Sequence, residues 1–112
     1  MNKQIILTTA FALFLIPAFA SAAPAESNPD FAFQHPARTQ VVYRVERIKW
    51  IVDQRQQAGD FTRHQADALK AEADGIHAEE KFFATRHGGR ITATEQKRLN
   101  WEVDQLFRQI NA

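Results

Sequence analysis

The chain carries the stretch GDFTRHQ at residues 59–65 and repeats its pattern as GRITATE at residues 89–95. Each copy has a glycine, an apolar residue two positions later, a threonine, and a glutamine or glutamate three positions after the threonine. The similarity continues downstream, where Leu69, Glu72 and Asp74 recur as Leu99, Glu102 and Asp104. A glycine of positive φ ends many helices, and T-x-x-[QE] is the capping box that begins them. The repeated stretch therefore predicts two turns, each joining one helix to the next.

Three helices are predicted around these turns, over residues 37–58, 63–86 and 93–110, with Pro36 suited to the first helical position. Their apolar residues recur at helical spacing. These residues are Val41, Val45, Ile48 and Val52; then Ala66, Leu69, Ala73, Ile76 and Phe83; then Leu99, Val103, Leu106 and Ile110. Short connections between long helices favour antiparallel neighbours. The expected fold is therefore all-α, an antiparallel up-down-up three-helix bundle over residues 37–112.

The N-terminal residues carry export features. Residues 1–22 combine Lys3, an apolar run and a final Ala-Ser-Ala, which is typical of a cleaved signal peptide. The apolar run is shorter than the roughly 20 residues that cross a bilayer, so we expect no stable membrane insertion and a periplasmic or secreted location. Residues 23–36 contain three prolines without helical periodicity, which predicts a flexible leader whose Phe31 and Phe33 are able to dock on the domain.

Composition excludes several classes of protein. Removal of residues 1–22 leaves 13 basic and 13 acidic residues, because Lys3 is the only charged residue lost, so nucleic-acid binding is not expected. The chain has no cysteine, which excludes a disulfide-stapled scaffold. It also lacks G-x-S-x-G, H-E-x-x-H and phosphate-binding glycine-rich motifs. We therefore expect a non-enzymatic protein with no catalytic residues and no cofactor.

Two histidines of the second predicted helix have acidic neighbours at helical spacing. The groups are His64 with Asp60 and Asp67, and His77 with Asp74 and Glu80. Such spacing arises readily in an acid-rich helix, and transition metals favour at least three convergent ligands. We therefore assign no metal site. A metal- or stress-responsive periplasmic protein that binds a cation weakly through these side chains is kept as the alternative function.

Aromatic and basic residues lie opposite the apolar lines of the first and third helices. Counted at about 100° per residue, these are Tyr43, Arg47 and Trp50 on the first helix, and Lys97, Trp101 and Arg108 on the third. Trp, Tyr and Arg outside a core dominate binding hot spots. They favour a module that binds another protein or an envelope component. The alternative is internal packing of these rings, or cover by Phe31 and Phe33.

The second predicted helix has small residues on a second face. A line of small residues and one aromatic lies opposite its apolar line, namely Ala68, Ala71, Gly75, Ala78 and Phe82. Alanine is simply the best helix former, but this face also suits the close approach of another helix, including that of a homodimer.

Glu80 interrupts the apolar line of the second helix, and antiparallel packing predicts a partly buried ion pair with Arg44 or Arg98.

The motifs resemble those of a loose group of small exported bacterial proteins. That group combines G-x-L-T-x-x-E-A-x-x-L with a later D-G-x-x-T-x-x-E-x-x-R-L, here matched over about residues 44–110. The matching residues are Gly59, Phe61, Thr62, Gln65, Ala66, Leu69, Gly88, Gly89, Ile91, Thr92, Glu95, Arg98 and Leu99. Gln65 and His87 depart from the group's usual Glu and Asp. The resemblance implies a helical fold and export, and it carries over no functional residue.

Overall fold

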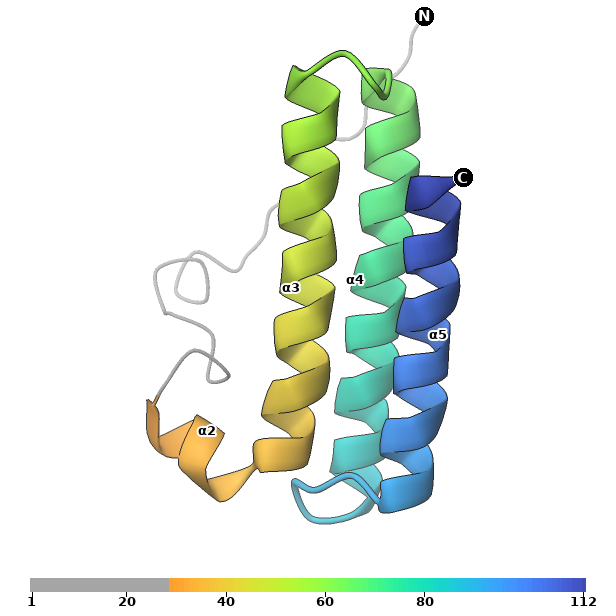
Figure 1. Cartoon of the computed structure of the whole chain (residues 1–112). Coiled ribbons are helices and arrows are strands. Elements are labelled where there is room, and N and C mark those ends of the chain that lie inside the picture. The colour runs from red at the N-terminus through yellow and green to blue at the C-terminus, as the bar shows by residue number, and fades with distance from the viewer. Residues whose placement is uncertain (1–28) are drawn as a thin grey trace, which may run out of the picture.

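The structure, a computed structural model, describes residues 29–112. Within this range the chain forms four helices and no strand (Figure 1): α2 (Pro29–Gln34), α3 (Pro36–Gln57), α4 (Arg63–Arg86) and α5 (Ala93–Asn111). The predicted all-α class is confirmed for these residues. The expected signal peptide, residues 1–22, and the first part of the expected leader, residues 23–28, lie outside the described residues.

The three long helices lie side by side, and each packs on the other two. The chain runs along α3, reverses in a short turn, returns along α4 and reverses again before α5 (Figure 1). Helix α2 lies across the beginning of α3. None of the helices within residues 29–112 combines the length and apolar character needed to cross a membrane.

Both predicted capping boxes are present. The Oγ1 of Thr62 accepts the backbone N–H of Gln65 at 3.0 Å, and the Gln65 side chain accepts the N–H of Thr62 at 2.8 Å. Thr92 and Glu95 repeat this exchange at 3.0 and 2.9 Å. Each box satisfies two backbone donors that the first turn of a helix leaves without an intrahelical partner, which explains why α4 and α5 begin where they do.

Glycines end the two preceding helices. Gly59 has a φ of 88°, and its N–H donates to the Gln56 carbonyl at 3.0 Å, while the N–H of Asp60 reaches the Arg55 carbonyl at 2.8 Å. This pair of bonds is the Schellman motif, which needs a residue in the left-handed region. At the end of α4 the N–H of Gly89 likewise reaches back to the Ala84 carbonyl at 2.8 Å.

The core lies between α3, α4 and α5 and combines the three predicted apolar lines. Leu69 and Phe83, which the sequence places in the line of α4, are only partly buried and pack against its margin. The buried residues are Val41, Val45, Ile48, Val52, Ala66, Ala73, Ile76, Ala84, Ile91, Leu99, Val103, Leu106 and Ile110. Because α4 contributes mostly alanine to this set, α3 and α5 lie close to its backbone.

Residues 29–34, which the sequence places in a flexible leader, form the short helix α2. Pro29 occupies the first helical position and Asp30 lies in the first turn, where a negative charge favours a helix. The ring of Phe31 lies 4.7 Å from that of His35 and 4.9 Å from the Arg38 guanidinium, measured between centres. These contacts with the beginning of α3 hold a segment that has no periodicity of its own.

The predicted partners of Glu80 are also wrong. Glu80 is fully buried, and its carboxylate accepts hydrogen bonds from Arg38, one of them from Nη2 at 3.4 Å. Arg44 instead binds Asp104 at 2.6 Å, and Arg98 lies 3.2 Å from Glu79.

The direction in which each arginine points explains this difference. Lys49 binds Asp74 and Asp53 binds Lys70, each at 2.8 Å. Continued along both helices, this register brings Glu80 level with residue 43, next to Arg44. Arg44 nevertheless turns towards α5, whereas Arg38 lies three residues before the buried Val41, on the same side of α3, and so reaches Glu80.

Candidate functional site

Helix α3 presents Tyr43, Arg47 and Trp50 on its outer face, and we call these three residues the α3 surface. Tyr43 is 64% exposed and Trp50 is 56% exposed. The Arg47 guanidinium lies 5.9 Å from the centre of the Trp50 ring, within the range of a cation–π contact. The helical period places the three residues away from the buried valines of α3.

The α3 surface rests on a helix that is fixed from both sides. Arg44 binds Asn100 at 2.9 Å and Asp104 at 2.6 Å on α5, and Lys49 binds Asp74 on α4 at 2.8 Å. The exposed rings are therefore carried by a helix whose neighbouring residues are tied to both other long helices.

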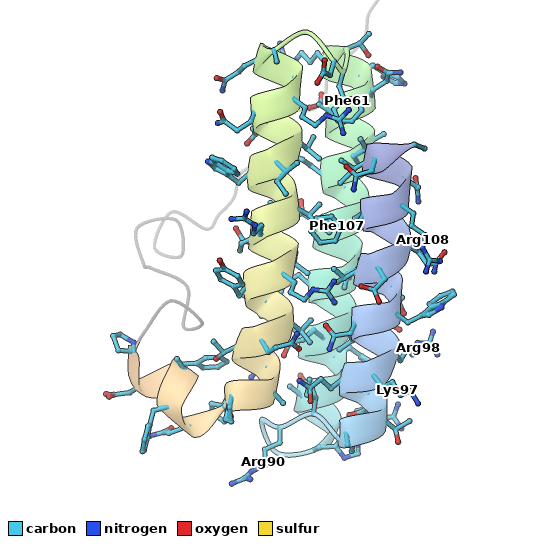
Figure 2. The ribbon with its side chains drawn as sticks, in the orientation of Figure 1. Phe61, Arg90, Lys97, Arg98, Phe107 and Arg108 are labelled. Atoms are coloured by element: carbon cyan, nitrogen blue, oxygen red, sulfur yellow. The ribbon has the colours of Figure 1, made fainter. Side chains whose placement is uncertain are left out.

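The second predicted group, Lys97, Trp101 and Arg108, lies on α5. Trp101 is 61% exposed, and the other two residues are exposed as well. Figure 2 shows Lys97 and Arg108 along the side of α5 turned away from α3. The structure therefore does not join this group to the α3 surface, and the six predicted residues form two separate surfaces.

Trp101 instead borders a shallow groove of about 330 Å³ between α4 and α5. Gly75 lies on the α4 side of this groove. The remaining lining residues are Glu72, Ile76, Glu102, Gln105, Leu106 and Gln109. The groove is not predictable from the sequence, because periodicity does not show which residue of α5 comes level with Gly75. A glycine within a helix of otherwise good helix formers was the signal that pointed to it.

The alternative in which the three aromatic rings pack inside the fold does not fit their exposure. All three predicted rings are more than half exposed. Phe31 contacts His35 and Arg38, not these rings, and Phe33 is 88% exposed.

The histidines form no cluster with acidic residues that suits a metal. His64 is exposed, and the Nε2 of His77 lies 4.0 Å from the Glu80 carboxylate that Arg38 also binds. Within residues 29–112 no three His, Asp or Glu side chains come together as potential ligands. The arrangement therefore adds no support to the cation-binding alternative.

The shifted pKa values in the described region have structural causes. The hydrogen bond to Asp74 raises the pKa of Lys49. Burial, followed by a hydrogen bond with Glu102, raises the pKa of Glu79. The backbone N–H of Thr92, with a further contribution from His87, lowers the pKa of Glu95. Each of these groups joins two helices or caps one of them.

The chain matches no protein-family model, no curated protein and no solved structure. The resemblance to small exported bacterial proteins therefore stays a prediction, and any function has to be argued from the surfaces described above.

Proposed function

We propose that this chain is a non-enzymatic exported protein whose long helices act as an antiparallel up-down-up three-helix bundle. Its role is to hold the α3 surface rigid for binding a protein or another component of the cell envelope. The export part of the proposal rests on the signal-peptide features of residues 1–22.

The exposure of Tyr43 and Trp50 carries the proposal. Rings of this size bury 150–250 Å² each when covered and are enriched at hot spots. Here both remain more than half exposed on a helix fixed by ion pairs and hydrogen bonds, so little conformational entropy is lost when a partner covers them. Arg47 adds a positive charge beside Trp50, which suits a partner with apolar and anionic groups.

Lys97, Trp101 and Arg108 remain in the proposal as a second contact surface. Their basic residues are exposed on the side of α5 away from α3, so a single compact partner does not cover both surfaces at once.

The test uses chemical crosslinking of intact cells, followed by capture of the protein and its crosslinked partner. We expect Trp50→Ala to remove the crosslinked species and to change the free energy of unfolding by less than about 0.5 kcal/mol, because the ring lies on the surface. Phe33→Ala is the matched control, since it removes an exposed ring outside the α3 surface. Unchanged crosslinking in Trp50→Ala would contradict the proposal, and a large loss of stability would assign the ring to packing.

A further inference from the structure

The face of α4 opposite the core is uncovered within residues 29–112. Ala68, Ala71, Gly75, Ala78 and Phe82, which we call the α4 stripe, are all exposed, with Phe82 at 58%. A Cβ added at Gly75 would meet no atom within 4 Å. Packing within the chain therefore does not require this glycine, although it costs about 1 kcal/mol of helix stability relative to alanine. Small side chains along the stripe allow a second helix to approach closely.

The stripe is continuous with the groove between α4 and α5. Gly75 belongs to both, and Trp101 borders the groove on the α5 side. One surface thus combines the groove of about 330 Å³ with two exposed rings, those of Phe82 and Trp101.

Charged residues flank the stripe. At 100° per residue, Glu72, Glu79 and Arg86 fall on the flank nearer α5, and Lys70, Asp74 and Lys81 on the flank nearer α3. Within the chain Arg98 binds Glu79, Asp53 binds Lys70 and Lys49 binds Asp74. Glu72 lies nearer the beginning of α4 than Arg86 does, and Asp74 lies nearer the beginning than Lys81 does.

This order is self-complementary about a two-fold axis. An axis beside Ala78 sets two α4 helices antiparallel and places each flank against the same flank of the second copy. Glu72 then comes within a turn of the second Arg86, and Asp74 within a turn of the second Lys81. A parallel pairing would instead set like charges against each other along both flanks.

The same axis accounts for the exposed ring of the stripe. Phe82 of the second copy comes level with Asp74, and so lies over Gly75 and the groove that Trp101 borders. A large apolar side chain is thus placed at the one position of the stripe that has no side chain.

We infer that a second copy of this chain covers the α4 stripe. The two copies pair through antiparallel α4 helices, and Phe82 of each occupies the groove between Gly75 and Trp101 of the other. This dimer does not use Tyr43, Arg47 or Trp50, so it stands or falls independently of the α3 surface, although it covers Trp101 of the second contact surface.

Sedimentation equilibrium of the purified protein tests the inference. We expect the wild type to dimerise, and Gly75→Leu to weaken the dimer by at least about tenfold, because the leucine fills the position taken by Phe82. A Cβ at Gly75 meets no atom within 4 Å in the isolated fold, and a circular dichroism spectrum checks that α4 remains helical in Gly75→Leu. Gln54→Leu on the outer face of α3 is the matched control and should dimerise as the wild type does. A wild type that stays monomeric at millimolar concentration overturns the inference, as does undiminished dimerisation of Gly75→Leu.

Exchanged charges test the antiparallel register without adding bulk. Glu72→Arg and Arg86→Glu should each weaken dimerisation, since each sets like charges together on the α5 flank. The double variant should restore it, because the charges are then exchanged and opposite again. A double variant no better than the single variants overturns this pairing.

Discussion

At the end of the molecule that holds the turn between α3 and α4, Arg55 of α3 reaches the carbonyl of Ile110 and lies 4.7 Å from the ring of Phe61. Figure 2 places Phe61 at that turn. At the opposite end, Arg38 of α3 binds Glu80 and lies 4.9 Å from the ring of Phe31. Each end thus has an arginine that joins a second element while stacking on an aromatic ring.

The two arginines differ in what surrounds them. The Arg55 side chain is 33% exposed, whereas that of Arg38 is 11% exposed and its partner Glu80 is fully buried. Removing a buried partner leaves a charge without compensation, while an exposed group regains water. Similar side-chain arrangements therefore contribute differently to stability, and burial decides the difference.

Arg38→Ala should produce the largest effect. We expect it to lower the free energy of unfolding by about 3–5 kcal/mol, because it leaves the buried Glu80 carboxylate without its guanidinium. Arg55→Ala should cost only about 1 kcal/mol, since its ion pair with Asp60, at 3.3 Å, is exposed and such pairs contribute little. Urea denaturation measures both.

The apolar double variant Arg38→Leu/Glu80→Leu is the control for this comparison. It should recover most of the stability lost in Arg38→Ala, because no charge is then buried. Equal losses in Arg38→Ala and Arg55→Ala would show that burial does not distinguish the two ends.

The capping threonines should behave alike at both ends. Thr62→Ala and Thr92→Ala should each lower the free energy of unfolding by about 1 kcal/mol, because each removes the acceptor for one backbone N–H at 3.0 Å. The two values are compared in the same denaturation series. A loss at one site more than about twice the loss at the other would mean that the surroundings, and not the local box, set the stability that the cap contributes.

The smallest effect is expected from acid titration of the second box. The pKa of Glu95 is lowered in the fold, so its contribution to stability is complete above about pH 4.3, its unfolded value, and is lost as the pH falls through the lowered value. Glu95→Gln should flatten the fall in melting temperature between pH 5 and pH 2, measured by circular dichroism.

Gln65→Glu supplies the matched comparison at the first box. Gln65 occupies the same capping position as Glu95, but His87 lies 3.0 Å from Glu95 alone. Gln65→Glu should therefore introduce a weaker acid dependence than the wild type shows at Glu95. An equal or stronger dependence would show that His87 contributes nothing to the cap.

Much of the local structure was predictable because it depends on neighbouring residues. A Schellman turn involves about six consecutive positions and a capping box about four, and periodicity identified most of the core. The helix of residues 29–34 was missed because contacts of Phe31 with His35 and Arg38 stabilise it. The partner of Glu80 was missed because level alone favours Arg44, whereas Arg44 turns towards α5 and Arg38 lies on the buried side of α3.

The candidate surfaces likewise combine features that follow from helical period with features that depend on helix packing. The outer placement of Tyr43, Trp50 and Trp101 follows from helical period, and the structure agrees that all three are exposed. Their separation into an α3 surface and an α5 group does not follow from the period, nor does the groove that joins Trp101 to Gly75. Both depend on how the helices are rotated and shifted against each other.

The sequence by itself determined where the helices of residues 36–111 begin and end and which face of each is apolar, because caps and periodicity act over a few residues. The tertiary structure alone decided that Arg38 neutralises Glu80, that residues 29–34 form a helix, and that Gly75 lies beside Trp101. The first and third outcomes depend on how helices far apart in the chain are shifted and rotated against each other, and the second depends on contacts of Phe31 that no periodic pattern indicates.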